Sequence, residues 1–261
     1  MAPMGDLKTS IIGYGTIGKA VHKLFPDSII YSRTFGNKRE VNKTDFSFIC
    51  VPTNELPNGQ CDTSIVEEVV SWASPKEAFI CLSTVEIGTT ERLVKKTGKR
   101  IVFQPEYFGE GIAHPLTELG NQPFVILGGK KEARNKVIEL YQTVYNSNLK
   151  IYQTDSRTAE VIKYMENSWL ATKVTFFNEF YDLCETFGVN YNEVREGFLH
   201  DSRVTPSHTF VYPGKRGWSG KCLPKDTAAL CYLARKAGRP ANLIEVVRGI
   251  NTIHNESSNT L

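Results

Sequence analysis

The sequence predicts an α/β fold, in which a doubly wound parallel sheet is followed by an all-α region. Up to about residue 155, short apolar runs alternate with amphipathic stretches, as in a parallel sheet covered by helices. After residue 155 the strand pattern stops and helical periodicity replaces it. Gly13, Gly15 and Gly18 run from the end of the first predicted strand into the helical stretch that follows it, as in the first βα unit of such a sheet.

Each short apolar run bounded by turn residues predicts one strand. The seven predicted strands cover residues 9–15, 28–32, 46–53, 77–84, 100–106, 123–129 and 149–155. The four helices predicted beyond them cover residues 156–187, 190–200, 225–237 and 240–256. We therefore expect an α/β domain at residues 1–155 and a helical domain at 156–261. The interval 201–224, with three prolines and three glycines, is long for a simple connection and indicates a functional loop.

The composition is that of a globular protein with no strong charge bias. The chain has 261 residues, is 41% hydrophobic, and carries 31 basic against 28 acidic side chains. This balance gives no argument for a nucleic-acid partner or an anionic membrane. No signal-peptide pattern or apolar stretch of membrane-spanning length is present, so we expect a cytoplasmic protein without membrane contact. The six cysteines form no CxxC pair, so we expect reduced thiols and no metal site.

The three glycines predict a dinucleotide site. Their spacing lets the chain turn tightly, brings backbone close to a pyrophosphate, and directs a helix N-terminus at the negative charge. A tight strand-to-helix turn without a ligand is the alternative. The position at the start of the first βα unit favours dinucleotide binding.

The second predicted strand ends in Ser32, Arg33 and Thr34, where an NAD site usually has an acidic residue. A guanidinium with two hydroxyls suits a 2′-phosphate and offers no carboxylate for a free ribose. We therefore expect NADP rather than NAD. Alternatively, Arg33 only stacks over the adenine at the surface.

The helical region contains a candidate catalytic group. Lys163 and Asn167 lie four residues apart, on one face of a predicted helix, and could bind a substrate oxygen. Cys222 lies beside Lys221 and Lys225 at a helix start expected near Pro224, conditions that favour a thiolate. Asp226 is expected in the first turn of that helix, where it could assist the thiol. A solvated lysine with a surface asparagine, and a merely structural cysteine, are the alternatives.

Taken in order, these pieces resemble the UDP-glucose/GDP-mannose dehydrogenase family. The matching stretches are "GYGTIG", "FICVPTNELPNGQCDTS", "STVEIGTTE", "QPEYFGEG", "AEVIKYMENSWLATKVTFFNE", "DSRV" and "GWSGKCLPKDT". They run in family order from residue 9 to about residue 250. The resemblance implies a Rossmann domain joined to a helical substrate and dimerisation domain. It also implies NAD-dependent oxidation of a sugar primary alcohol to a carboxylate in two hydride transfers.

The resemblance assigns a role to each candidate residue. Cys222 would capture the aldehyde as a thiohemiacetal that becomes a thioester, while Lys163 and Asn167 would hold the reacting oxygen. The residues around the hydrolytic water would be Glu106, Glu110, Thr84 and Asp226, with Glu106 as general base. The cofactor site would comprise Gly13, Tyr14, Gly15, Thr16, Ile17, Gly18, Ser32, Arg33, Thr34, Val51, Pro52, Thr53, Ser83, Glu110 and Lys225. The sugar site would comprise Tyr107, Phe108, Arg203, Tyr212, Gly217 and Trp218, with Arg203 acting across a subunit boundary.

The sequence departs from the family pattern in three respects. Family members continue into a third domain that binds the substrate's nucleotide, and this chain ends before it. We therefore expect that another subunit or a partner protein holds the nucleotide, or that the substrate is smaller. The acidic ribose ligand is replaced by Ser32, Arg33 and Thr34. Ser219 stands where glycine is usual and Gly109 where a larger residue is common, so we expect a reshaped pocket.

Two other functions remain open. One is a β-hydroxyacid-type dehydrogenase that uses Lys163 and Asn167 in a single hydride transfer and needs no cysteine. The other is a non-catalytic dinucleotide-binding subunit. Whatever the function, we expect a homodimer, because the last predicted helix carries an apolar stripe formed by Leu243, Val246, Val247, Ile250 and Ile253.

Overall fold

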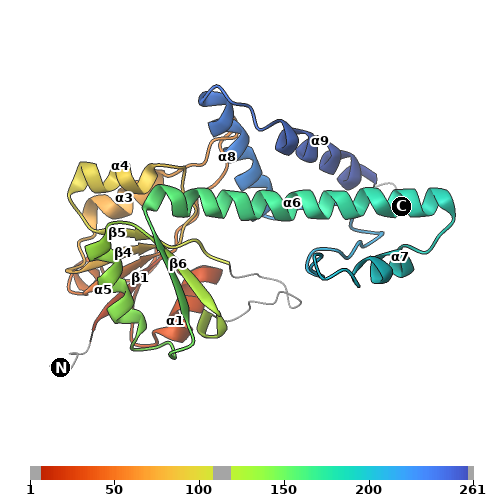
Figure 1. The fold of residues 1–261 in the computed structure, drawn as a ribbon. Coiled ribbons are helices and arrows are strands. Elements are labelled where there is room, and N and C mark those ends of the chain that lie inside the picture. Colours follow the sequence, from red (N-terminus) through yellow and green to blue (C-terminus); the bar gives the residue numbers. More distant parts are fainter. Residues whose placement is uncertain (1–6, 108–118, 258–261) are drawn as a thin grey trace. The chain divides into compact units, whose positions relative to one another are not determined.

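A computed structural model describes residues 7–107 and 119–257 of the chain (Figure 1). The chain divides into two compact units. Unit 1 comprises Met1–Asn54 and Cys61–Lys163, and unit 2 comprises Glu55–Gln60 and Tyr164–Leu261.

Unit 1 contains a seven-stranded sheet in the order β2-β1-β3-β4-β5-β6-β7. The strands are β1 (Thr9–Ile12), β2 (Ile29–Tyr31), β3 (Phe46–Ile49), β4 (Ala78–Cys81), β5 (Ile101–Phe103), β6 (Phe124–Gly128) and β7 (Lys150–Thr154). The first five strands are parallel, as predicted. However, β6 runs antiparallel to β5, and β7 is parallel to β6. The sheet is therefore not parallel throughout. The sequence did not indicate this, because a buried apolar run has the same composition in either strand direction.

Helices cover both faces of this sheet (Figure 1). They are α1 (Thr16–Leu24), α2 (Lys38–Val41), α3 (Ser64–Trp72), α4 (Thr89–Thr97) and α5 (Lys131–Tyr141), with a short 3₁₀ turn at Leu119–Asn121. Successive strand residues point to opposite faces, so Ile11 packs with α1 and α5 while Ile12 packs with α3 and α4. This alternation produces two apolar cores and confirms the doubly wound arrangement.

Unit 2 is helical. Its helices are α6 (Ser156–Phe187), which begins in unit 1, α7 (Tyr191–Phe198), α8 (Cys222–Lys236) and α9 (Asn242–Ser257). Ala171, Trp218 and Val247 form a small buried cluster, which joins α6, the loop before α8, and α9. Several apolar side chains of α6 stay exposed, including Met165 and Trp169. Of the stripe predicted on the last helix, Val247 is buried, whereas Leu243, Val246 and Ile253 are exposed.

Helix α8 begins at Cys222, three residues before the predicted start. The N–H groups of the first turn have no partner within a helix, so Pro224 fits at the third position without losing a hydrogen bond. Cys222 is thus the first residue of α8. The expectation that Asp226 lies in the first turn was wrong, because it is the fifth helical residue.

The six cysteines all fall in the described ranges, and all are free thiols. Cys222 is exposed, whereas the other five are buried or half-buried. Burial raises the pKa of the Cys81 thiol to about 12, and it also raises the pKa values of Cys50 and Cys231. These three thiols are therefore unsuited to be nucleophiles near neutral pH.

Over residues 7–107 and 119–257, no helix combines the length and apolar character needed to cross a membrane. The same residues contain no cluster of histidine, cysteine and carboxylate side chains that could hold a metal ion.

Candidate active site

The turn between β1 and α1 gives each of its three glycines a distinct environment. Gly13 has φ of +97°, and a Cβ there would meet the carbonyl oxygen of Cys50 at 2.4 Å. A Cβ on Gly18 would meet the carbonyl oxygen of Gly13 at 2.1 Å, so this glycine allows α1 to pack closely on the turn. Gly15, by contrast, has nothing within 4 Å of its Cβ position. Two glycines therefore serve the fold, and the third leaves open space at the start of α1.

This turn lies where an open α/β sheet usually binds its ligand. Strand β1 sits between β2 and β3, so the chain order reverses beside it, and a crevice is expected at the carboxyl ends of these strands. The first turn of α1 carries no acidic residue that would repel a pyrophosphate. The open space at Gly15 and the N–H groups of α1 fit a dinucleotide.

Other predicted cofactor residues frame the same strand ends. Val51, Pro52 and Thr53 follow β3, and Ser83 follows β4. The Ser83 hydroxyl donates to the carbonyl of Val51 at 2.7 Å, which joins the two loops. We therefore expect Ser83 to shape the crevice rather than to offer its hydroxyl to a ligand.

The predicted side chains around α1 differ in orientation. The Tyr14 hydroxyl lies 2.6 Å from Nδ1 of His22, and the Tyr14 and Phe35 rings pack in a T-shaped arrangement. Tyr14 and Ile17 both pack against the apolar core, whereas Thr16 is exposed. Tyr14 and Ile17 are therefore expected to act on a ligand through their backbone.

Ser32, Arg33 and Thr34 form a turn directly after β2. The Ser32 hydroxyl oxygen accepts from the backbone N–H groups of Thr34 and Phe35, each at 3.3 Å, so it belongs to the turn itself. Arg33 is exposed, and its side chain forms no hydrogen bond or ion pair with the described residues. Its guanidinium thus remains available to a phosphate or an adenine ring.

Lys163 meets the "QPEY" stretch within unit 1. Its Nζ donates to the backbone carbonyl of Glu106 at 2.5 Å and lies 5.1 Å from the centre of the Tyr107 ring. Lys163 is buried, whereas Glu106 and Tyr107 are half-buried. Thr84 is half-buried and follows β4, and its carbonyl accepts from the Cys61 thiol at 3.6 Å. Two stretches far apart in the sequence therefore meet at the lysine.

Glu160 is a further residue at this site that the sequence analysis did not identify. It is fully buried on α6, and its carboxylate accepts from the backbone N–H of Gly88 at 2.5 Å and of Thr90 at 2.9 Å. Burial raises the pKa of Glu160, and the backbone hydrogen bonds oppose that rise. The contact ties α6, one turn before Lys163, to the N-terminus of α4. A carboxylate three residues before Lys163, in an otherwise apolar stretch, was the available sequence signal.

Asn167, Lys225 and Asp226 meet within unit 2. Asn167 Nδ2 donates to Asp226 Oδ2 at 2.5 Å, and Lys225 Nζ pairs with Asp226 Oδ1. Only 1% of Asp226 is exposed, so both carboxylate oxygens are satisfied inside the protein. The pair joins α6 to the N-terminal part of α8, which begins at Cys222.

The loop before α8 is held by buried polar contacts. Asn178 Oδ1 accepts from Nε of Arg216 at 2.8 Å and from the N–H of Gly217 at 3.0 Å. Asn251 Oδ1 accepts from the backbone N–H of Trp218 at 2.7 Å, and its Nδ2 donates to the Trp218 carbonyl at 2.9 Å. Trp218 is 6% exposed, and its indole N–H donates to Thr175. Gly217 and Trp218 therefore fix the loop, whatever their contact with a substrate.

The remaining predicted substrate residues lie apart from these contacts. Arg203 is exposed and pairs with Asp201 at 2.6 Å, and the aspartate's hydrogen bonds from Arg203 lower its pKa. Tyr212 is 62% exposed on the long loop. Phe108 and Glu110 lie outside the described residues.

Two protein-family models match the chain. Residues 30–147 match the NAD binding domain of the UDP-glucose/GDP-mannose dehydrogenase family, and residues 157–253 match the central domain of the same family. The first description supports NAD as cofactor. It gives no support to the expected preference for NADP.

Curated relatives and solved structures agree with these matches. The UDP-glucose 6-dehydrogenase of Rhizobium meliloti (strain 1021) is 32% identical over 229 residues, which cover 82% of this chain and 51% of that protein. The GDP-mannose 6-dehydrogenase of Pseudomonas savastanoi pv. phaseolicola is 30% identical over 231 residues, covering 81% and 51% respectively. The chain thus spans about half the length of these relatives. A UDP-glucose dehydrogenase structure from the hyperthermophilic archaeon Pyrobaculum islandicum has a similar fold, with a TM-score of 0.83 at 24% identity, over 97% of this chain and 70% of that one.

The glycine turn allows fold and ligand binding to be tested separately. Gly13→Ala is expected to lower the free energy of unfolding by about 2–4 kcal/mol, because of its positive φ and the close Cys50 carbonyl. Gly15→Ala meets no such obstacle and is expected to fold normally but to bind NAD at least about tenfold more weakly. Urea unfolding and NAD titration measure the two effects. Wild-type NAD affinity in Gly15→Ala would show that the motif is only a structural turn.

Proposed function

The chain belongs to the UDP-glucose/GDP-mannose dehydrogenase family, and we propose that it oxidises the primary alcohol of a nucleotide sugar to a carboxylate in two steps. The observation that supports this most directly is the arrangement at α8. An exposed cysteine opens the helix, and a buried aspartate one turn later is bonded to Asn167. A dehydrogenase that performs one hydride transfer has no use for such a thiol.

The dinucleotide would lie on the β1–α1 turn, with its pyrophosphate at Gly15 and the start of α1. When bound, NAD supplies the hydride acceptor for each oxidation. The chain's own contribution is to hold the sugar oxygen, retain the aldehyde, and deliver water.

Lys163 and Asn167 would bind the reacting oxygen. The Lys163 ammonium donates to the Glu106 carbonyl. The Asn167 amide donates to Asp226. Since each side chain is already fixed by a protein contact, the pair is preorganised to stabilise an alkoxide.

Cys222 would retain the substrate between the oxidations. The N-terminal end of α8 carries a partial positive charge, which favours a negative charge at this position. The sulfur would add to the aldehyde carbon, forming a C–S bond and a thiohemiacetal. Loss of hydride from that carbon leaves a thioester, and water then breaks the C–S bond, releasing the acid and the thiolate.

Glu106 is the proposed general base for the hydrolysis, with Thr84 helping to position the water. Both oxygens of Asp226 are already engaged, one by Asn167 and one by Lys225. We therefore assign Asp226 to positioning the thiol and the amide, and not to proton transfer. Glu110 keeps its predicted role beside the water.

The named relatives act on UDP-glucose and GDP-mannose, and we propose UDP-glucose as the first substrate to assay. We further propose a homodimer in which Arg203 reaches the active site of the partner subunit. The Arg203 side chain pairs with Asp201 but stays exposed at the surface, as this role requires. Another subunit or a partner protein would hold the nucleotide, or the substrate would be smaller than a nucleotide sugar.

The proposed function predicts a stoichiometry. With NAD and UDP-glucose, two NADH are expected for each substrate consumed, and the product is the carboxylate. Absorbance at 340 nm, combined with product analysis by chromatography, measures this ratio. A ratio of one with a released aldehyde would assign the chemistry to Lys163 and Asn167 alone, and NAD binding without turnover would indicate a non-catalytic subunit.

Arg33 allows the cofactor preference to be tested. If its free guanidinium binds a 2′-phosphate, Arg33→Ala should lower kcat/KM for NADP at least about tenfold and leave that for NAD almost unchanged. Arg39→Ala, which removes a nearby exposed arginine, is the matched control. An equal loss of kcat/KM with both cofactors would mean that Arg33 stacks on the adenine and does not bind the 2′-phosphate.

A further inference from the structure

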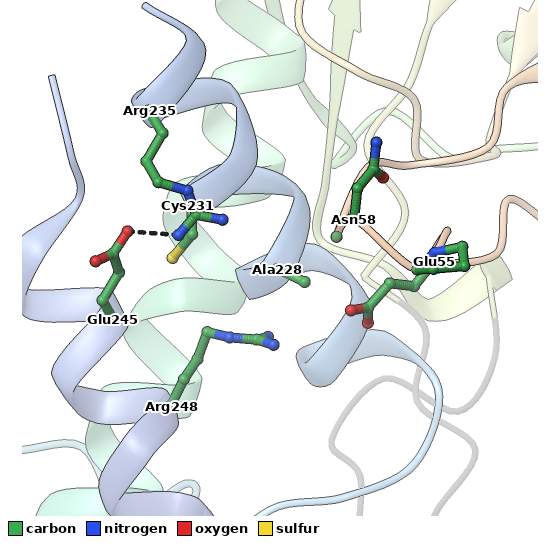
Figure 2. Close-up of a pocket in the computed structure, with 9 residues that line it drawn as sticks. Glu55, Asn58, Ala228, Cys231, Arg235, Glu245 and Arg248 are labelled. Atoms are coloured by element: carbon green, nitrogen blue, oxygen red, sulfur yellow. Dashed lines mark hydrogen bonds and ion pairs between the residues drawn. The ribbon is translucent and has the colours of Figure 1, made fainter. Parts of the chain in front are cut away.

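A cavity of about 360 Å³ lies within unit 2, between α8, α9 and the loop at residues 55–60 (Figure 2). Its volume is within the range of small-molecule sites. The 55–60 loop is preformed, since Leu56 and Gly59 are joined by a backbone hydrogen bond of 2.8 Å and the Leu56 N–H donates to Gln60. The cavity walls are therefore defined by the fold.

The cavity carries charged groups of both signs. Arg235 and Glu245 form an ion pair of 2.8 Å on the helical wall. Arg248 and Glu55 extend toward each other from opposite walls (Figure 2). Among the described residues, Arg248 donates hydrogen bonds through Nη1, and its Nε and Nη2 have no partner. The Glu55 carboxylate has no hydrogen-bond or ion-pair partner among these residues either. One wall therefore offers N–H donors and the other offers an acceptor.

This cavity is distinct from the proposed catalytic site. Ala228, Cys231 and Arg235 line it, and at about 100° per residue they lie roughly 140–200° around the α8 axis from Asp226. Asp226 itself faces Asn167 of α6. The cavity thus lies on the face of α8 opposite the aspartate.

Arg248 connects the cavity to the first turns of α8. Its Nη1 donates to the Pro224 carbonyl at 2.7 Å and to the Thr227 hydroxyl at 2.8 Å. These two residues flank Lys225 and Asp226, and Cys222 lies one turn before Asp226. A ligand that draws the guanidinium into the cavity would weaken its hold on this turn.

We propose that the cavity is a second ligand site that takes a small hydroxylated phosphate ester, such as a sugar phosphate. The phosphate accepts from Arg248, with Arg235 nearby, because a guanidinium matches phosphate oxygens in a fork geometry. A hydroxyl of the same ligand donates to the Glu55 carboxylate. Occupancy loosens the start of α8, so the ligand acts as a regulator of the thiol. The binding site stands independently of the proposed function, whereas the regulatory effect rests on it.

Calorimetric titration of the full chain with glucose 6-phosphate tests the binding site. Binding is expected for the wild type, with at least tenfold weaker affinity in Arg248→Met and no change in Arg239→Met, an exposed arginine outside the cavity. Glu55→Gln should lower the affinity for glucose 6-phosphate and leave the affinity for inorganic phosphate unchanged. It also serves as a second variant should Arg248→Met fold poorly, since Glu55 is exposed. The proposal would be overturned if the wild type did not bind glucose 6-phosphate, or if both cavity variants bound it with the affinity of the wild type. Binding of zwitterionic glycine in place of the phosphate ester would also overturn it.

Alkylation of Cys222 by iodoacetamide tests the connection to α8 without requiring turnover. Glucose 6-phosphate is expected to slow alkylation at least threefold in the wild type, because a loosened helix start stabilises the thiolate less. The effect should be absent in Arg248→Met and retained in Arg239→Met. An unchanged wild-type rate at saturating ligand would disprove the regulatory effect, whatever the outcome of the NADH measurement.

Discussion

The buried carboxylate of Asp226 is the constraint on which the proposed chemistry depends. An unpaired charge with 1% exposure would cost several kcal/mol, and the protein avoids this cost by engaging one oxygen with Asn167 and the other with Lys225. Because Asn167 lies on α6, satisfying this carboxylate also fixes the N-terminal part of α8 against α6. Cys222 is the first residue of α8, so the same contact also fixes the helix that carries the thiol.

Much of the fold could be predicted from the sequence because local signals and burial agree. All seven strands lie within the predicted apolar runs. Helix α6 has its predicted bounds, since Asp155 accepts from the Thr158 N–H at 2.9 Å before its start and Gly188 follows its end with φ of +68°. The glycine turn was predictable for a similar reason, because only a residue without Cβ fits where Gly13 and Gly18 approach backbone oxygens.

Other features depend on tertiary contacts that periodicity does not encode. Apolar composition does not set strand direction, so the antiparallel placement of β6 was not foreseen. Glu160 accepts a hydrogen bond from the Thr90 N–H of α4, 70 residues away in sequence. The sequence pattern of α6, which carries Glu160, gives little indication of this contact. The backbone and indole N–H groups of Trp218 anchor the loop before α8, a role that the sequence pattern did not indicate. The site residues are thus recognisable by type, but which of them hold the site together follows only from the structure.

The proposed two-step oxidation requires that the aldehyde stay on Cys222 between the two hydride transfers. Turnover of UDP-glucose and NAD in the presence of semicarbazide, a small trap for free aldehydes, tests it most directly. We expect no semicarbazone from the wild type and undiminished acid formation, whereas Cys222→Ala should give semicarbazone in place of acid. Stoichiometric trapping with the wild type would show that the aldehyde leaves the protein, and would contradict retention of the aldehyde on Cys222.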